Sequence, residues 1–478
     1  MVSRLDEADS RGIADCCVGE KQLRISVVGL GKLGAPLAAV LASRGFHVVG
    51  TDIDPEPVSE LNAGRAPVSE PGLQDIIDLS RDRISATTDV AQAVSTSDAT
   101  FVIVPTPSGA DGAFSNAHVI SAMRKIGSAL RTKQGYHLVV ITSTVMPGST
   151  DGPIRQALEE AAGRAAVPRI GLCYSPEFIA LGSVIHDMLN PDFVLIGESG
   201  QRAGDVLESI YQSMTDNRPL IQRMNFVNAE LTKIAVNTYV TTKISFANMI
   251  SDLCDRLPGA DASTVTAALG CDTRIGGKYL RPGLGYGGPC FPRDNAALSA
   301  MAHQIGTSAT LADATDRVNR QQPARIVGLV RRRLATGTVG ILGLSYKPNT
   351  SVVEESQGVE IAKLLTAQGY RVVVFDPQAT EAAMSELGDQ VEAAADVTAC
   401  ASAADVLVVA TPWPSFRDLP LVALQRPHGK RVAIIDCWRL LPAAEVDAVV
   451  DLIYPGRAWA EADVEPAAPP VRLRLNSA

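Results

Sequence analysis

The sequence predicts an α/β protein with two Rossmann-like doubly wound domains joined by a central domain that is built on a long helix. First, a strand-like run ends in the glycine motif Gly29-Leu-Gly-Lys-Leu-Gly34, and a helical pattern and a second strand ending in Asp52 follow it. Second, one long helical pattern replaces the strand pattern from Asn225 to Leu257. Third, the strand, loop, helix and strand of the first part return after residue 338, so the two halves repeat one architecture.

The composition excludes several classes of partner. The chain has 478 residues, 46% of them hydrophobic, and its 43 basic and 52 acidic residues give a formal net charge of −9. We therefore expect about two to four domains and no nucleic-acid partner. Because every apolar run is short and interrupted, we also expect no membrane-spanning segment. The eight cysteines lack metal-ligand spacing, which predicts reduced thiols in the cytoplasm and no metal site.

Changes of pattern along the chain predict the domain boundaries. We expect a disordered extension over residues 1–20, which contain no apolar core of signal-peptide length. A Rossmann domain is predicted over 21–217, a central helical domain over 218–325 and a second Rossmann-like domain, which lacks the glycine motif, over 326–460. The Pro- and Ala-containing tail over 461–478 is typical of a flexible end.

The glycine motif predicts a dinucleotide site, because it follows a strand, opens a helix and has an acid at the end of the next strand. In this interpretation Gly29 makes the tight turn, Gly31 lets the pyrophosphate approach the backbone, and Gly34 lets the helix pack on the strand. Asp52 would bind the ribose 2′-hydroxyl and repel a 2′-phosphate, which favours NAD over NADP. The alternative is an ordinary strand-to-helix turn without a ligand.

Polar residues that follow the later strands are further candidates. Thr106 and Thr144 lie beyond the carboxyl ends of two strands, where ligands bind in open α/β sheets, although each hydroxyl could equally cap a turn. Glu177 also follows a strand, and could be an acid or base or only a charge at a helix start. Lys347, in the first loop of the second half, is placed to contact a phosphate.

The long helical pattern contains two costly polar residues. Lys233 and Asn237 lie four apart and therefore on one face of the helix. On a mostly apolar helix they need partners, unless the lysine reaches solvent. The helix has few charges, which predicts a buried connector between domains.

Cys290 lies in the glycine-rich stretch Gly285–Asp294, just before a helix that we expect to begin near Pro292 and to continue to Leu334. A thiol at a helix N-terminus is close to the positive end of the helix dipole, which predicts a lowered pKa and a nucleophile. The alternative is a buried free cysteine in a glycine turn.

Taken together, these stretches resemble the UDP-glucose/GDP-mannose dehydrogenase family, from about residue 23 to residue 457. The motifs that carry the resemblance are Gly29-x-Gly31-x-x-Gly34, Val104-Pro-Thr-Pro, Ser143-Thr144, Ser175-Pro-Glu177-Phe, Ala229-Glu-Leu-x-Lys233-x-x-x-Asn237, Arg274-Ile-Gly, Gly-Tyr-Gly-Gly-x-Cys290-Phe-Pro-x-Asp294 and Gly343-Leu-x-Tyr-Lys347-Pro-Asn-Thr. The cysteine motif is most similar to that of members that act on UDP-glucose.

The resemblance implies an NAD-dependent enzyme that oxidises UDP-glucose twice, to UDP-glucuronate, through a thiohemiacetal and a thioester on Cys290. It also implies that the first Rossmann domain (21–217) binds NAD, that the second (326–460) binds the UDP-sugar, and that a homodimer forms through the central helix (218–325). Leu181 and Pro289 depart from the common pattern, so a UDP-N-acetylhexosamine is the alternative substrate. A non-catalytic sensor of NAD or of a nucleotide sugar remains a third possibility. A β-hydroxyacid dehydrogenase would need neither Cys290 nor the second Rossmann-like half.

The resemblance also implies roles for individual residues. The catalytic residues are Cys290, Lys233, Asp294, Asn237, Glu177 and Thr144. The NAD contacts are Gly29, Gly31, Lys32, Leu33, Gly34, Asp52, Thr106 and Thr144. The substrate contacts are Glu177, Phe178, Lys233, Asn237, Arg274, Tyr279, Leu280, Arg281, Gly287, Phe291 and Lys347. Arg274 would come from the neighbouring subunit, and Glu354 stands where the family often has an arginine that reaches NAD.

Overall fold

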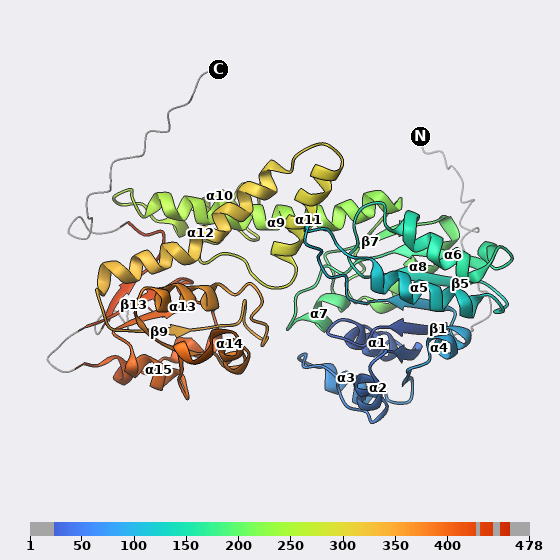
Figure 1. Ribbon diagram of the computed structural model, residues 1–478, viewed down its shortest axis with the longest axis horizontal. Helices are drawn as coiled ribbons and strands as arrows, with labels where there is room; N and C mark the ends of the chain where they lie inside the picture. Colours follow the sequence, from blue (N-terminus) through green and yellow to red (C-terminus); the bar gives the residue numbers. More distant parts are fainter. Residues whose placement is uncertain (1–22, 427–430, 443–449, 459–478) are drawn as a thin grey trace, which may run out of the picture.

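The computed structural model describes residues 23–426, 431–442 and 450–458, and it consists of two sheet domains with a helical domain between them (Figure 1). The predicted fold class is therefore confirmed. The predicted extension over residues 1–20 and the tail over 461–478 lie outside the described residues.

The first domain is organised around an eight-stranded sheet with the order β3-β2-β1-β4-β5-β6-β7-β8. Its strands are β1 (Arg24–Val28), β2 (His47–Thr51), β3 (Ile84–Thr87), β4 (Ala99–Val102), β5 (His137–Ile141), β6 (Ile170–Tyr174), β7 (Phe193–Glu198) and β8 (Leu220–Met224). Neighbouring strands are parallel except for the antiparallel pair of β6 and β7. Because β8 belongs to this sheet, the sheet extends past the boundary that the sequence predicts at residue 217.

Helices cover both faces of the first sheet. They are α1 (Gly34–Ser43), α2 (Pro55–Asn62), α3 (Leu73–Leu79), α4 (Val90–Thr96), α5 (Ala117–Leu130), α6 (Arg155–Ala162), α7 (Val184–Leu189) and α8 (Gln201–Met214), with a kinked turn η1 (Thr150–Ile154) before α6. The side chains of β5 alternate between two hydrophobic cores, with Leu138 and Val140 in one and Val139 and Ile141 in the other. Because both faces of the strand are buried in a core, successive residues of β5 can all be apolar, and residues 138–141 form a continuous apolar run.

Within the described residues, the second sheet has six strands in the order β11-β10-β9-β12-β13-β14, which corresponds to the order β3-β2-β1-β4-β5-β6 within the first sheet. Its strands are β9 (Thr338–Leu342), β10 (Arg371–Phe375), β11 (Glu392–Ala393), β12 (Val406–Val409), β13 (Val432–Asp436) and β14 (Val450–Ile453). The described helices of this domain are α13 (Gln357–Ala367), α14 (Thr380–Leu387) and α15 (Val397–Ala403). All of these strand pairs are parallel, as the predicted internal repeat requires.

Four helices form the central domain: α9 (Phe226–Cys254), α10 (Ala262–Gly270), α11 (Phe291–Gln304) and α12 (Thr310–Arg333). The helical pattern predicted from Cys290 to Leu334 is thus two helices. The break occurs at Gly306, whose φ of +78° favours glycine, and the Thr307 N–H bonds the Ala302 carbonyl at 2.8 Å to end α11.

The long helix α9 buries many polar side chains and exposes large apolar ones. Its buried polar residues are Glu230, Lys233, Asn237, Thr238, Thr241, Ser245, Asn248 and Ser251. Its exposed large apolar residues are Val227, Leu231, Tyr239, Phe246, Met249 and Leu253. The prediction of a buried connector therefore holds for one face of α9 only, because six large apolar side chains on the other face are exposed within one chain.

Candidate functional site

Cys290 lies where the central helices meet the second sheet domain. It is exposed to solvent, and it is the N-cap residue of α11. Before it, Gly288 has a φ of +81° and packs against Tyr346, whose ring an added Cβ would meet at 2.6 Å. Gly287 is equally constrained, because a Cβ there would lie 2.2 Å from the carbonyl oxygen of Glu355. The glycines of this loop are therefore needed for its close approach to the second domain.

Polar side chains from α9 and α11 converge beside this cysteine. Asp294, on the first turn of α11, is only 1% exposed and accepts a hydrogen bond of 2.6 Å from Asn237 Nδ2. Its other oxygen, Oδ1, accepts no hydrogen bond and lies 3.7 Å from Arg293 Nε. Lys233, one turn before Asn237, donates to the Glu177 carbonyl at 2.6 Å. The structure thus brings together four of the six predicted catalytic residues.

Burial dominates the electrostatics of these groups. It raises the pKa of Cys290, and Asp294 adds to the increase, while Lys233 and Arg293 oppose it. Although the residue as a whole is exposed, the neighbouring groups crowd the thiol and displace part of its solvent, so its pKa is raised and not lowered as predicted. Burial also lowers the pKa of Lys233 and raises that of Asp294. All three groups are shifted toward their neutral forms.

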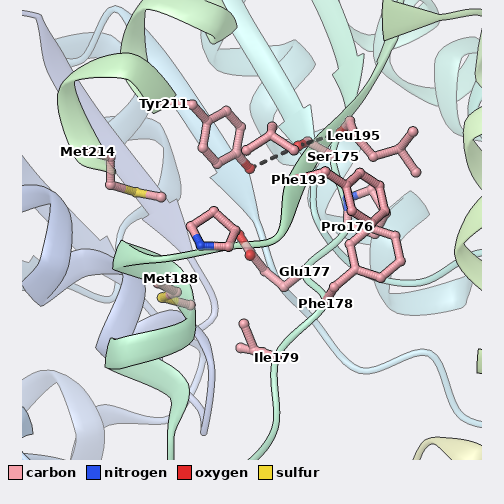
Figure 2. A pocket seen from close by; sticks show the side chains of 12 residues that line it. Ser175, Pro176, Glu177, Phe178, Ile179, Met188, Phe193, Leu195, Tyr211 and Met214 are labelled. Carbon is pink, nitrogen blue, oxygen red and sulfur yellow. Dashed lines mark hydrogen bonds between the residues drawn. The ribbon is translucent and has the colours of Figure 1, made fainter. Parts of the chain in front are cut away.

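The Glu177 side chain lies in a small pocket of the first domain. Figure 2 shows the carboxyl group near Tyr211, with Met188 and Met214 also lining the pocket. Burial raises the pKa of Glu177 to about 7, against the opposing effects of Lys233 and of the Tyr211 hydroxyl. Glu177 therefore contacts Lys233 through its backbone, while its carboxyl group occupies this pocket.

The glycine motif leaves space for a dinucleotide on one side only. A Cβ on Gly29 would lie 2.0 Å from the Ile103 carbonyl oxygen, and one on Gly34 would lie 1.8 Å from the Gly29 carbonyl oxygen. At Gly31 a Cβ would meet nothing within 4 Å. Gly29 and Gly34 thus pack against the protein, whereas Gly31 is open, as the close approach of a pyrophosphate requires. Lys32 is exposed beside it, and Leu33 is the N-cap residue of α1.

The predicted NAD contacts beyond the glycine motif lie at the carboxyl ends of β2, β4 and β5. Asp52 accepts a hydrogen bond of 2.7 Å from the Leu30 N–H, which ties it to the glycine loop. The Thr106 hydroxyl donates to the Thr144 carbonyl at 2.8 Å, so it braces the two loops. Arg293 Nη1 donates to the Thr106 carbonyl at 3.2 Å and links this edge to the helix that carries Asp294.

The predicted contacts from the second domain also approach the cysteine. Lys347 is half-buried, and burial lowers its pKa, while Asp187, Glu70 and Cys290 act in the opposite direction. The two sheet domains therefore face each other across the end of α11. Among the other predicted substrate contacts, Phe178 packs against Phe193 and Leu280 is buried. Arg281 donates a hydrogen bond to the Trp438 carbonyl. The ring of Phe291 packs edge-on against that of Tyr286, with 6.2 Å between the ring centroids.

Arg274 and Tyr279 lie outside this cluster. The Arg274 side chain is 86% exposed and pairs with Asp272 at 2.6 Å. Tyr279 is 53% exposed and has a φ of +63°. Within one chain, neither residue has a described contact with Cys290 or Lys233.

The sequence interpretation missed residues that contact the predicted ones. Arg293 stands beside Asp294, and Tyr346 is part of the motif Gly343–Thr350, although the sequence interpretation assigned no role to either residue. Glu354 was noted only as a departure from the family, yet its carbonyl accepts a 2.9 Å hydrogen bond from the Gly288 N–H, and it raises the pKa of Cys290. Tyr211 lies on α8, and no feature of the sequence connects it with Glu177.

Two negative findings concern the described part of the chain. It contains no group of three or more His, Cys, Asp and Glu residues that could hold a metal ion. None of its helices combines the length and the hydropathy needed to cross a membrane.

Family models match most of the chain. The model of the NAD binding domain of the UDP-glucose/GDP-mannose dehydrogenase family matches residues 23–215. The central domain model of the same family matches residues 227–321, and its UDP binding domain model matches residues 340–443.

Individual relatives agree with these matches. UDP-glucose 6-dehydrogenase AglM of Haloferax volcanii is 37% identical over 404 residues, which cover 83% of this chain and 93% of that protein. GDP-mannose 6-dehydrogenase of Pseudomonas aeruginosa is 34% identical over 358 residues, or 74% of this chain and 81% of that protein. The structure of a UDP-glucose dehydrogenase from Pyrobaculum islandicum has a TM-score of 0.83 at 36% identity, and the match covers 94% of this chain and 100% of that one.

Proposed function

The chain belongs to the UDP-glucose/GDP-mannose dehydrogenase family and is an NAD-dependent nucleotide-sugar oxidoreductase, and we propose that it oxidises UDP-glucose twice, to UDP-glucuronate. The observation that carries the proposal is the convergence of Cys290, Lys233 and Asp294 between the two sheet domains. The names of the relatives from Haloferax and Pyrobaculum support UDP-glucose as the substrate.

The glycine motif and Asp52 would hold NAD, which would accept one hydride, and a second NAD would replace the NADH before the second oxidation. In the first oxidation Lys233, with its lowered pKa, takes the proton of the primary alcohol. The resulting aldehyde cannot give up a second hydride until a nucleophile has added to its carbon. The Cys290 thiol therefore gives its proton to Lys233 or Asp294, its sulfur adds to that carbon, and the carbonyl oxygen takes up the proton, which gives a thiohemiacetal.

The second oxidation removes hydride from the thiohemiacetal carbon while Lys233 or Asp294 takes the hydroxyl proton, and it leaves a thioester on Cys290. Water then attacks the thioester carbon, the carbon–sulfur bond breaks, and the thiol and a carboxylate are released. Asn237 would hold Asp294 and stabilise developing charge on oxygen. Glu177, with a pKa of about 7, and Thr144 would position or activate the water.

The second domain would bind the UDP part of the substrate. Lys347 supports this assignment because it lies close enough to Cys290 for the cysteine to influence the pKa of the lysine. The loop before α11 supplies three more of the predicted substrate contacts, Leu280, Arg281 and Gly287, and the helix begins with a fourth, Phe291. A UDP-N-acetylhexosamine is the alternative substrate, because Leu181 is uncharged and packs on the first core.

The apolar outer face of α9 supports a homodimer. Tyr239 is 67% exposed and Phe246 is 42% exposed on a helix that buries eight polar residues. An apolar helix face of this kind is covered in a stable protein, and a second copy carries the same face. A partner subunit would also explain how the exposed Arg274 could contact a substrate. The free thiols of the described cysteines are compatible with a cytoplasmic enzyme.

The test is the yield of NADH from a limiting amount of each of several nucleotide sugars. UDP-glucose should give two NADH per molecule, and UDP-N-acetylglucosamine and GDP-mannose should react more slowly. The Cys290→Ser variant should lose the second NADH, whereas Cys271→Ser, which changes the other exposed cysteine, should keep both. A wild-type yield of one would contradict the double oxidation, and faster turnover of another sugar would reassign the substrate.

A further inference from the structure

The loop that leads to Cys290 is fixed at Tyr286 by a side chain from α12. Asn319 Nδ2 donates to the Tyr286 carbonyl at 2.9 Å, and Asn319 Oδ1 accepts from the Tyr286 N–H at 2.8 Å. Asn319 is only 7% exposed, so little solvent competes for these bonds. A Cβ on Gly285 would lie 2.3 Å from Asn319 Oδ1. The carboxamide and the loop backbone therefore fit each other closely.

A second asparagine holds the same loop from α9. Asn248 Nδ2 donates to the Leu284 carbonyl at 3.0 Å, and its Oδ1 accepts from the Gly283 N–H at 3.0 Å. Asn248 is fully buried. Both carboxamides thus satisfy loop backbone groups that no strand or helix pairs.

The side chain of Tyr286 is fixed as well. Asn295 Nδ2 donates to the Tyr286 hydroxyl at 2.9 Å, and the hydroxyl donates to Asp316. Asn295 follows Asp294 on α11, so the loop and the helix on either side of Cys290 share one buried polar network. Such a network is rigid when all its members are bonded.

We infer that Asn319, together with Asn248, is a positioning residue that places the Cys290 thiol for attack on the aldehyde. The inference rests on the proposed function. Cys290 ends the loop that Asn319 and Asn248 fix, whereas the orientation of Asp294 is fixed separately by its hydrogen bond with Asn237. Loosening the loop should therefore displace the thiol more than the groups that serve the first oxidation. A displacement of about 1 Å can slow a reaction on the order of 10²-fold.

The test uses single turnovers of UDP-glucose with excess enzyme, in which the two NADH appear in two phases. In Asn319→Leu the first phase should change less than about threefold and the second should slow at least about tenfold. Asn319→Ala removes the same bonds without added bulk, and it serves if the leucine variant does not fold. Gln322→Leu is the matched control, because this buried amide on α12 donates to the Val318 carbonyl at 3.0 Å and not to the loop.

A second readout is independent of turnover. Hydrogen–deuterium exchange of the peptide that spans residues 283–290 should accelerate in both Asn319 variants and stay unchanged in Gln322→Leu. Unchanged exchange, or equal slowing of both phases, would overturn the inference. A wild-type enzyme that releases only one NADH would instead refute the proposed function, and the exchange result would still decide whether Asn319 orders the loop.

Discussion

Asn237 on α9 and Asp294 on α11 are joined by a hydrogen bond of 2.6 Å between two buried side chains. The bond occupies one oxygen of Asp294 and leaves Oδ1 without a hydrogen-bond partner. Burial raises the pKa of this carboxyl group, and Lys233 opposes the increase. Asp294 is thus held in one orientation with an oxygen that can take or give a proton.

Replacing Asp294 with asparagine should reduce kcat by about 10²- to 10⁴-fold, because the side chain keeps its volume but cannot carry a proton. The melting temperature should change little. Asp313→Asn is the control, because Asp313 accepts from Ser299 Oγ at 2.6 Å on the neighbouring helix and has no described contact with the cysteine site. A kcat close to the wild-type value would contradict the role of Asp294.

Replacing Glu354 with glutamine should make Cys290 more reactive at neutral pH. The Glu354 carboxylate contributes to the raised pKa of the thiol, so the thiolate should form at lower pH without it. The rate of Cys290 alkylation by iodoacetamide, followed by mass spectrometry between pH 6 and 9, measures this change. Because Glu354 is exposed, about 1 M salt should reduce the difference. Glu355→Gln is the control, and identical curves for all three proteins would contradict the prediction.

Most of the fold could be predicted from the sequence, because its signals are local. The motif Gly29–Gly34 lies between a strand and a helix, and the strands are short apolar runs bounded by loop residues. The break at Gly306 was missed because helical residues continue on both sides of one glycine. The exposed face of α9 was missed because a helix rich in apolar residues reads as buried whichever face packs.

The candidate site could be predicted only where its residues belong to recognisable motifs. Cys290, Lys233 and Asp294 were found in this way. The thiol pKa could not be predicted, because it depends on burial and on Glu354, whose approach is set by packing between domains. The direction of the Glu177 side chain likewise depends on Tyr211, which lies on a different helix.

The stability of the first domain should depend on His137. This histidine is buried at the start of β5, and its Nε2 lies 2.8 Å from Thr100 Oγ1. Burial, with the nearby Lys133, lowers its pKa from 6.5 to about 3. Between these values the unfolded chain binds a proton that the folded chain does not. The free energy of unfolding should therefore fall as the pH falls below 6.5, by up to about 1.4 kcal/mol per pH unit.

Thermal melting between pH 7 and pH 5 measures this effect. The His137→Gln variant should be less stable at pH 7 but should lose less of its melting temperature on acidification than the wild type. His118→Gln changes an exposed histidine and should keep the wild-type slope. Equal slopes for wild type and His137→Gln would show that this histidine does not control the acid response.

The location of Arg274 on the surface predicts complementation between subunits. If Arg274 completes the site of its partner, Arg274→Ala and Cys290→Ala should each be inactive as homodimers. A heterodimer of the two variants has one site with both intact residues, so it should recover about half of the wild-type activity. Co-expression with two different affinity tags isolates this heterodimer.

The matched control is a heterodimer of Lys233→Met and Cys290→Ala. Lys233 influences the pKa of Cys290 within one chain, so these two residues serve the same site and neither site of this heterodimer is complete. It should remain inactive, which excludes wild-type contamination and subunit-independent rescue. If the Arg274→Ala heterodimer also stays inactive although both tags co-purify, Arg274 acts within its own chain. An active Arg274→Ala homodimer would instead show that Arg274 has no part in the reaction.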